Sequence, residues 1–343
     1  MHSSIKNLIN SCLILFVSFS SFGQTKKYLK KNKNAISFTY SENPIYARGI
    51  VYKDRRLFLG NSDGSVYYIN IEKKTSTLLF KHTDIEEIRD VEIVNNTIIA
   101  MHSGENGKII LLSLDGSIQV FKNDEWKGIF FDGIDFIGDT GFLMGDPKEG
   151  YFSLLHTKDG GKTWKKCEGE IKAEKGEAGF AASGTNVQVL NDSTFTFISG
   201  GMKSRFFKTI DSGKTWSNVI LPYYPGESTG AYSMNFLNDS IGVVVGGDYL
   251  DPAIRMNICF FTEDGGDSWF NSIEPVRGYR SCVISHKSIF YSCGRNGIDV
   301  SLDNGQTWVP FADGPYFSLC TTDQQLIATT KNGKIVFFDL IKL

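Results

Sequence analysis

Three arginines stand at equivalent positions in this 343-residue chain. Arg48, Arg89 and Arg280 each come six residues before a turn that follows a run of β-branched and aromatic residues. The three turn residues are Asp54, Asn95 and His286. A guanidinium is a planar fork of donors that fits a carboxylate or phosphate, and each desolvated pair contributes about 1.5–3 kcal/mol. If the repeated runs place these positions around one axis, the sequence predicts an anion-binding site.

Other polar residues are expected on the same face of the molecule. Arg205, Asp248 and Tyr249 are candidate ligand-binding residues beside the three arginines. Four further residues are candidates for catalysis: Tyr279, Glu177, Asp90 and Asp146. The same charged side chains have a second interpretation, in which they tie neighbouring structural units together through ion pairs. Arg89 and Asp90 are candidates for that structural role.

One eight-residue string, S/T-x-D-x-G-x-T/S-W, occurs four times. Its aspartate can accept hydrogen bonds from backbone N–H groups and hydroxyls across a turn, and its glycine supplies a positive φ. Its tryptophan begins the next strand and packs against the neighbouring one. The string therefore predicts a structural staple in a hairpin turn. The aspartates and tryptophans concerned are Asp159, Trp164, Asp211, Trp216, Asp264, Trp269, Asp303 and Trp308.

Around each string lie short apolar runs that form a unit of four strands. Six such units follow one another from residue 49, whereas the C-terminal end offers only three strands. The missing strand is available at residues 35–39. Pairing it with the last unit would remove an exposed sheet edge. The sequence therefore predicts an all-β protein, a seven-bladed β-propeller of four-stranded antiparallel blades, with the last blade closed by the N-terminal strand.

This organisation resembles exported propellers with the Asp-box, or bacterial neuraminidase repeat, related to the photosystem II stability/assembly factor within the WD40/YVTN-like repeat superfamily. The resemblance covers about residues 35–343. Besides the four strings it rests on residues 145–147, 177–185, 199–201, 246–249 and 278–281. It implies a binding or assembly scaffold. In a propeller the repeated turns lie opposite the funnel, where a ligand is expected.

Two functions are compatible with these residues. The first is an exported binding protein that recognises an unknown protein partner, an anionic small molecule or a glycan at the central funnel. The second is a sialidase-like glycoside hydrolase acting on an acidic sugar, because sialidases also use three arginines, a tyrosine nucleophile and a glutamate. In that case Tyr279 would be the nucleophile, Glu177 would activate it, and Asp90 or Asp146 would be the acid/base. The sialidase signature Phe/Tyr-Arg-Ile-Pro is replaced here by residues 46–50.

The first 23 residues are typical of a secretory signal peptide. Lys6 precedes an apolar run at residues 12–19, and cleavage is predicted before Gln24. We expect a lysine-rich spacer at 24–34, a propeller at 35–343 and export to the periplasm or the medium. No transmembrane anchor is expected after cleavage, because the apolar run is too short to span the roughly 30 Å hydrocarbon core of a membrane.

Charge and cysteine content narrow the possible partners and cofactors. The formal charge is −2, which gives no electrostatic argument for binding nucleic acid. No dinucleotide, haem or flavin motif occurs, and the histidines lack metal-ligand spacing, so we predict neither cofactor nor metal. Five cysteines follow the signal, an odd number. Cys282 and Cys293 flank a short hairpin and are able to pair, but buried free thiols are the default expectation.

Overall fold

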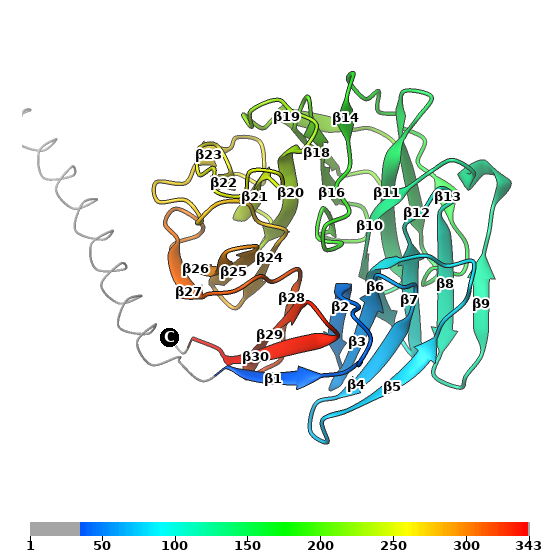
Figure 1. Ribbon diagram of the computed structural model, residues 1–343. Helices are drawn as coiled ribbons and strands as arrows, with labels where there is room; N and C mark the ends of the chain where they lie inside the picture. Colours follow the sequence, from blue (N-terminus) through cyan, green and yellow to red (C-terminus); the bar gives the residue numbers. More distant parts are fainter. Residues whose placement is uncertain (1–34, 342–343) are drawn as a thin grey trace, which may run out of the picture.

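The computed structural model describes residues 35–341, so the predicted signal peptide (1–23) and spacer (24–34) lie outside the described residues. Within that range the regular structure is almost entirely β, with one short 3-10 helix, η1 (Asp124–Trp126). The strands form seven sheets that follow one another around a central axis (Figure 1). The predicted seven-bladed β-propeller is confirmed.

Each of the first three blades is an antiparallel meander that runs from an inner strand, a, to an outer strand, d. Blade 1 contains β2 (Ala47–Lys53), β3 (Arg56–Asn61), β4 (Val66–Asn70) and β5 (Thr75–Phe80). Blade 2 contains β6 (Ile88–Val94), β7 (Thr97–His102), β8 (Lys108–Ser113) and β9 (Ile118–Phe121). Blade 3 contains β10 (Phe131–Ile137), β11 (Thr140–Lys148), β12 (Tyr151–Thr157) and β13 (Lys165–Lys166).

Blades 4 to 6 repeat this order. Blade 4 contains β15 (Val187–Val189), β16 (Phe195–Ile198), β18 (Arg205–Thr209) and β19 (Ser217–Ile220). Blade 5 contains β20 (Thr229–Phe236), β21 (Gly242–Asp248), β22 (Cys259–Thr262) and β23 (Phe270–Asn271). Blade 6 contains β24 (Cys282–His286), β25 (Ile289–Gly294), β26 (Gly297–Ser301) and β27 (Val309–Ala312). Two short strands in the connections, β14 (Glu177–Ala178) and β17 (Gly200–Gly201), pair with each other, and β17 continues the pairing to β20.

Blade 7 joins the two ends of the described chain (Figure 1). Its C-terminal strands are β28 (Leu319–Thr321), β29 (Gln325–Thr330) and β30 (Lys334–Asp339), and β1 (Ile36–Thr39) pairs antiparallel with β30. Ile36 lies opposite Phe337. The closure by the N-terminal strand is confirmed. It covers the backbone edge of β30, which would otherwise be free to pair with another chain.

The hydrophobic core lies between adjacent blades. Phe142 of blade 3 stacks on Phe195 of blade 4 with ring centroids 5.2 Å apart, and Phe197 and Phe207 stack within blade 4 at 4.4 Å. Large aromatic rings suit this position because each fills the wedge between two twisted sheets and buries a large apolar area. The apolar packing therefore holds the blades to one another and leaves the axis to other side chains.

The four repeated turns share one hydrogen-bond pattern. In the first, Thr157 Oγ1 donates to Asp159 (2.8 Å), and Asp159 accepts from Thr163 N (2.9 Å) and Oγ1 (2.6 Å). The turns at Asp211, Asp264 and Asp303 repeat these bonds. Gly161 has a φ of 83°, which favours glycine at that position. All four turns connect strands c and d, on the face opposite the one described below.

The five cysteines within residues 35–341 are all free, and four of them are buried. Cys282 lies directly opposite Cys293 across the β24–β25 ladder. None of the helices in this part of the chain has the length and apolar character needed to cross a membrane.

Candidate functional site

A cavity of about 350 Å³ opens at the centre of the ring, on the face built from the d–a and b–c connections. Nine aromatic or small residues come from connections or strands of blades 4 to 7, and three arginines form the cationic part of the lining. The arginines are Arg48, Arg89 and Arg295; the aromatic residues are Phe180, Tyr232, Tyr249, Tyr279, Tyr316 and Phe317; the rest are Ala181, Ala182 and Ser281.

Arg48 and Arg89 lie side by side on this lining and reach across the axis. Arg48 Nη1 donates to the carbonyl of Ala182 (2.8 Å), and Arg89 Nη1 donates to the carbonyl of Ala181 (3.0 Å). Both also face Glu87, at 3.9 Å for Arg48 Nε and 2.9 Å for Arg89 Nε. Two positive charges thus share one carboxylate, and the group of three keeps a net charge of +1.

A β-bulge explains how these two arginines come to face the axis. The pairing of β2 with β3 shifts by one residue around Arg48, and that of β6 with β7 shifts around Arg89. Equivalent shifts surround Tyr232 in β20 and Asp132 in β10. A bulge adds one residue to a strand and re-aims its side chain. Of the four residues, Arg48, Arg89 and Tyr232 line the cavity and Asp132 does not.

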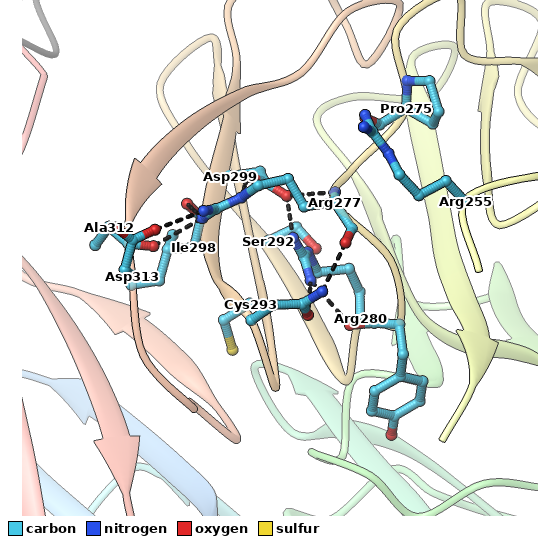
Figure 2. Close-up of polar contacts among 12 residues, drawn as sticks. Arg255, Pro275, Arg277, Arg280, Ser292, Cys293, Ile298, Asp299, Ala312 and Asp313 are labelled. Atoms are coloured by element: carbon cyan, nitrogen blue, oxygen red, sulfur yellow. Dashed lines mark hydrogen bonds and ion pairs between the residues drawn. The ribbon is translucent and has the colours of Figure 1, made fainter. Parts of the chain in front are cut away.

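Arg280 does not line the cavity, which corrects the expectation of three converging guanidiniums. It precedes β24, whose regular pairing with β25 begins at Cys282. Its side chain is fully buried, forms an ion pair with Asp299 and donates to the carbonyl of Tyr279 (2.9 Å) (Figure 2). The side chain turns into blade 6, and its role there is structural. Arg295, on the β25–β26 connection, takes the third cationic place.

The aromatic wall of the cavity is a connected group of rings. Phe180 and Tyr232 stack with centroids 4.2 Å apart, and Tyr279 meets Tyr232 edge-on at 4.8 Å. On the other side Arg48 lies 5.5 Å from the centroid of the Phe317 ring. Burial raises the pKa of Tyr279 to about 12, although Arg48 and Arg295 act in the opposite direction. The Tyr279 phenol is therefore a neutral donor near pH 7.

Glu177 and Arg205 meet in the structure, but outside the cavity lining. Glu177 accepts from Arg205 Nε (2.8 Å) and Nη2 (2.6 Å), and from Ser199 Oγ and the Glu174 backbone. Arg205 also donates to the carbonyl of Lys172 (2.9 Å). Both side chains are buried. This is the ion pairing between structural units that formed the second interpretation of these residues, and it anchors the segment that leads to Phe180.

The remaining predicted site residues are spread around the face. Burial raises the pKa of Asp90, which accepts from Ile134 N (3.0 Å) and so joins blades 2 and 3. Asp146 accepts from Gly179 N (2.9 Å), and Asp248 accepts from Ser228 Oγ (2.7 Å). None of these three carboxylates lines the cavity, whereas Tyr249 and Tyr279 do. The structure therefore does not assemble the four catalytic candidates.

Asp135 in β10 gives a pH-dependent prediction. Burial raises its pKa to about 6, although it accepts from Val189 N (2.6 Å). An unfolded aspartate titrates near 3.8, so between these values the folded protein holds the proton more tightly and loses stability as the pH rises. The measured quantity is the free energy of unfolding of the wild type minus that of Asp135→Asn. We expect this difference to fall by on the order of 2–3 kcal/mol from pH 4 to pH 7. Parallel pH profiles in urea unfolding would contradict this.

Several lining residues were not predicted from the sequence. The six-residue count that located Arg48 and Arg89, applied to the turns at Asn238 and Asp323, lands on Tyr232 and Phe317. The sequence therefore contained a signal for these two aromatic residues, in the same spacing that located the arginines. Arg295 carried no such signal, since it lies on a connection whose path depends on its neighbours. Within residues 35–341 no group of three or more His, Cys, Asp or Glu side chains is placed to hold a metal ion.

Comparison with known proteins identifies the fold. No family model and no curated protein matches the chain. A catalytically inactive virginiamycin B lyase from Staphylococcus aureus, solved with quinupristin, has a TM-score of 0.68 and 12% identity over 90% of this chain and 99% of that chain. The WD40 propeller domain of Doa1 has a TM-score of 0.64 and 10% identity over 89% and 95%. The likeness is in the fold alone.

A chain of the mitotic checkpoint complex is also similar, with a TM-score of 0.60 and 9% identity over 91% of this chain and 92% of that chain. The similar structures thus include an enzyme and a component of a protein assembly. A propeller supports both kinds of activity, so the function of this chain has to be argued from its own side chains.

Proposed function

We propose that this protein is an exported binding protein whose central cavity holds the anionic group of a cyclic small molecule, with an acidic sugar as the best fit. The proposal of export rests on residues 1–23 of the sequence. The observation that carries the binding role is the cavity lining, where three guanidiniums meet a wall of aromatic rings. Guanidiniums bind carboxylates, and aromatic rings cover the apolar faces of a cyclic ligand.

The size and charge of the cavity support this ligand class. A volume of about 350 Å³ suits a single small molecule rather than a polymer. Arg48 and Arg89 are already oriented by Ala181, Ala182 and Glu87, so little order is lost when an anion approaches them. Arg295 is exposed and has no hydrogen-bond or ion-pair partner among residues 35–341, which leaves its whole donor fork for a ligand.

A sialidase-like hydrolase finds no support in the same contacts. Within the described residues no hydrogen bond joins the Tyr279 hydroxyl to a carboxylate, and its raised pKa is the opposite of what a nucleophile needs. Glu177, which would activate it, already accepts four hydrogen bonds. Binding without hydrolysis is therefore the function that the geometry favours.

Isothermal titration calorimetry with N-acetylneuraminic acid and glucuronic acid tests the proposal. We expect at least one acid to bind and neutral glucose to bind much more weakly, because the arginines act on the carboxylate. Arg295→Ala should weaken binding about tenfold, the loss of one charge-assisted contact. An aryl sialoside should remain intact in the presence of the protein.

Arg255→Ala is the matched control for this experiment. Arg255 is also exposed and lies on the connection after β21, but its guanidinium donates to the carbonyl of Pro275 and does not line the cavity (Figure 2). We expect this variant to bind like the wild type. Equal binding of glucose, or equal losses in the two arginine variants, would rule out the cavity as an anion site.

A further inference from the structure

The connection that leads into blade 4 crosses the central axis of the ring. Residues 179–185, which we call the axial segment, lie between β14 and β15. Arg89 of blade 2 donates to the carbonyl of Ala181 (3.0 Å), and the Thr185 hydroxyl lies 2.5 Å from that of Ser233 in blade 5. Blades 2 and 5 stand on opposite sides of a ring of seven blades (Figure 1). A segment that contacts both of them therefore lies across the axis.

Further hydrogen bonds fix the path of the axial segment. Gly179 N donates to Asp146 of blade 3 (2.9 Å), and Ser183 Oγ donates to the carbonyl of Ser281, which precedes blade 6 (2.7 Å). The cavity-lining arginine of blade 1 donates to a carbonyl of the same segment. Blades 1, 2, 3, 5 and 6 thus all contact it. A connection that is bonded from so many sides opens far less readily than an exposed loop.

Glycine at two positions allows the backbone of the axial segment to pass close to the inner strands. At Gly184 φ is 76°, and a Cβ would lie 2.1 Å from the carboxyl carbon of Asp90. At Gly179 a Cβ would lie 2.5 Å from the carboxyl group of Asp132. Any other residue at these positions would displace its neighbours. The backbone of the segment therefore fills the space between these inner strands.

Two alanines of the axial segment face the central cavity. Ala181 and Ala182 line it, whereas residues 183–185 do not. Because the segment lies across the axis, the cavity ends on these alanines. Arg48 and Arg89 donate to their carbonyls, so two of the positive charges of the site lie at its closed end.

We propose that the axial segment closes the channel and that Ala181 and Ala182 set the depth of the central site, so that it admits only a terminal acidic group. This selection rests on the proposed function of the cavity as an anion site. A carboxylate at the end of a molecule reaches Arg48 and Arg89 while the rest of the molecule extends toward the open funnel. An acidic residue inside a polymer has a neighbour on each side, and the closed end leaves no path for the second one. The ligand is therefore a free acidic sugar or the acidic end of a glycan.

Thiol labelling of Ala182→Cys in the full chain tests the closed end with small charged probes. The probes are an anionic and a cationic methanethiosulfonate, and the control is Ala253→Cys. Ala253 is exposed, lies on the β21–β22 connection of the same face and does not line the cavity. We expect the ratio of anionic to cationic labelling rates to be about tenfold higher at position 182, because the arginines attract the anion. The wild type gives the background from its own cysteines, and Ala181→Cys serves if Ala182→Cys does not fold.

Protection from this labelling shows which acids reach the closed end. N-acetylneuraminic acid at about ten times its Kd should slow the labelling of Ala182→Cys about tenfold, because only the free protein reacts. Polysialic acid at the same concentration of carboxylate should leave the rate unchanged, since almost all of its acidic residues are internal. Glucuronic acid and hyaluronan form a second pair with the same expected difference. Comparison of 3′-sialyllactose with N-acetylneuraminic acid distinguishes a glycan end from a free sugar as the better-bound source.

Two results would overturn the proposal. One is the same ratio of anionic to cationic labelling at positions 182 and 253, and the other is equal protection by a polymer and its monomer. A higher ratio at position 182 without protection by either monomer would support the closed, cationic end while contradicting an acidic sugar as the ligand.

Discussion

Replacement of Asp299 by alanine is expected to lower the free energy of unfolding by about 3–5 kcal/mol. Asp299 is 1% exposed, accepts from Arg277 Nε (2.6 Å) and backbone N (2.8 Å), and forms an ion pair with the fully buried Arg280 (Figure 2). Alanine would leave the Arg280 guanidinium buried without a counter-charge, which is far more costly than the loss of a surface contact. Urea unfolding followed by tryptophan fluorescence measures the change.

Asp313→Ala is the control for this experiment. Asp313 also lies 2.6 Å from Arg277, but its side chain is 92% exposed, so water replaces the lost contact. We expect almost no change in the urea midpoint. Equal effects of the two substitutions would mean that burial of the Asp299 pair contributes nothing. The result also tests the structural role of Arg280. If Arg280 served only to bind a ligand, loss of its partner Asp299 would leave the stability of blade 6 unchanged.

Glu177→Ala is expected to destabilise the protein by a comparable amount, about 3–5 kcal/mol. The substitution removes a fully buried carboxylate. It leaves Arg205, whose side chain is 9% exposed, without its counter-charge. It also leaves the Ser199 hydroxyl and the Glu174 backbone N–H without an acceptor. Glu177→Gln should cost less, because the amide oxygen still accepts part of this network. Chemical denaturation of the three proteins, wild type included, gives the order directly.

Glu174→Gln provides the comparison three residues away. Glu174 forms an ion pair with Lys203 at 3.1 Å, but both side chains are partly exposed to solvent. We expect its denaturation curve to overlay that of the wild type, since exposed pairs contribute little. If Glu177→Ala had the same urea midpoint of unfolding as the wild type, the Glu177–Arg205 pair would have no structural role. The catalytic assignment of Glu177 would then have to be considered again.

The architecture was predictable from the sequence because its determinants are local. Each strand corresponds to a short apolar run in the sequence. Each repeated turn contains both the donors and the acceptors of its own hydrogen bonds, as at Asp159 and Thr163. Counting these units gave seven blades, with one strand missing at the C-terminal end. The pairing of β1 with β30 followed because an unpaired edge is unfavourable.

The composition of the site was decided by tertiary structure. Arg48, Arg89 and Arg280 occupy the same sequence position relative to their turns, yet only the first two face the axis. The difference lies in their partners: Arg48 and Arg89 donate to the carbonyls of Ala182 and Ala181 across the axis, whereas Arg280 forms an ion pair with a buried aspartate. Asp299 lies on another strand of blade 6, so its meeting with Arg280 depends on how the strands pack and not on the residues next to Arg280 in the sequence.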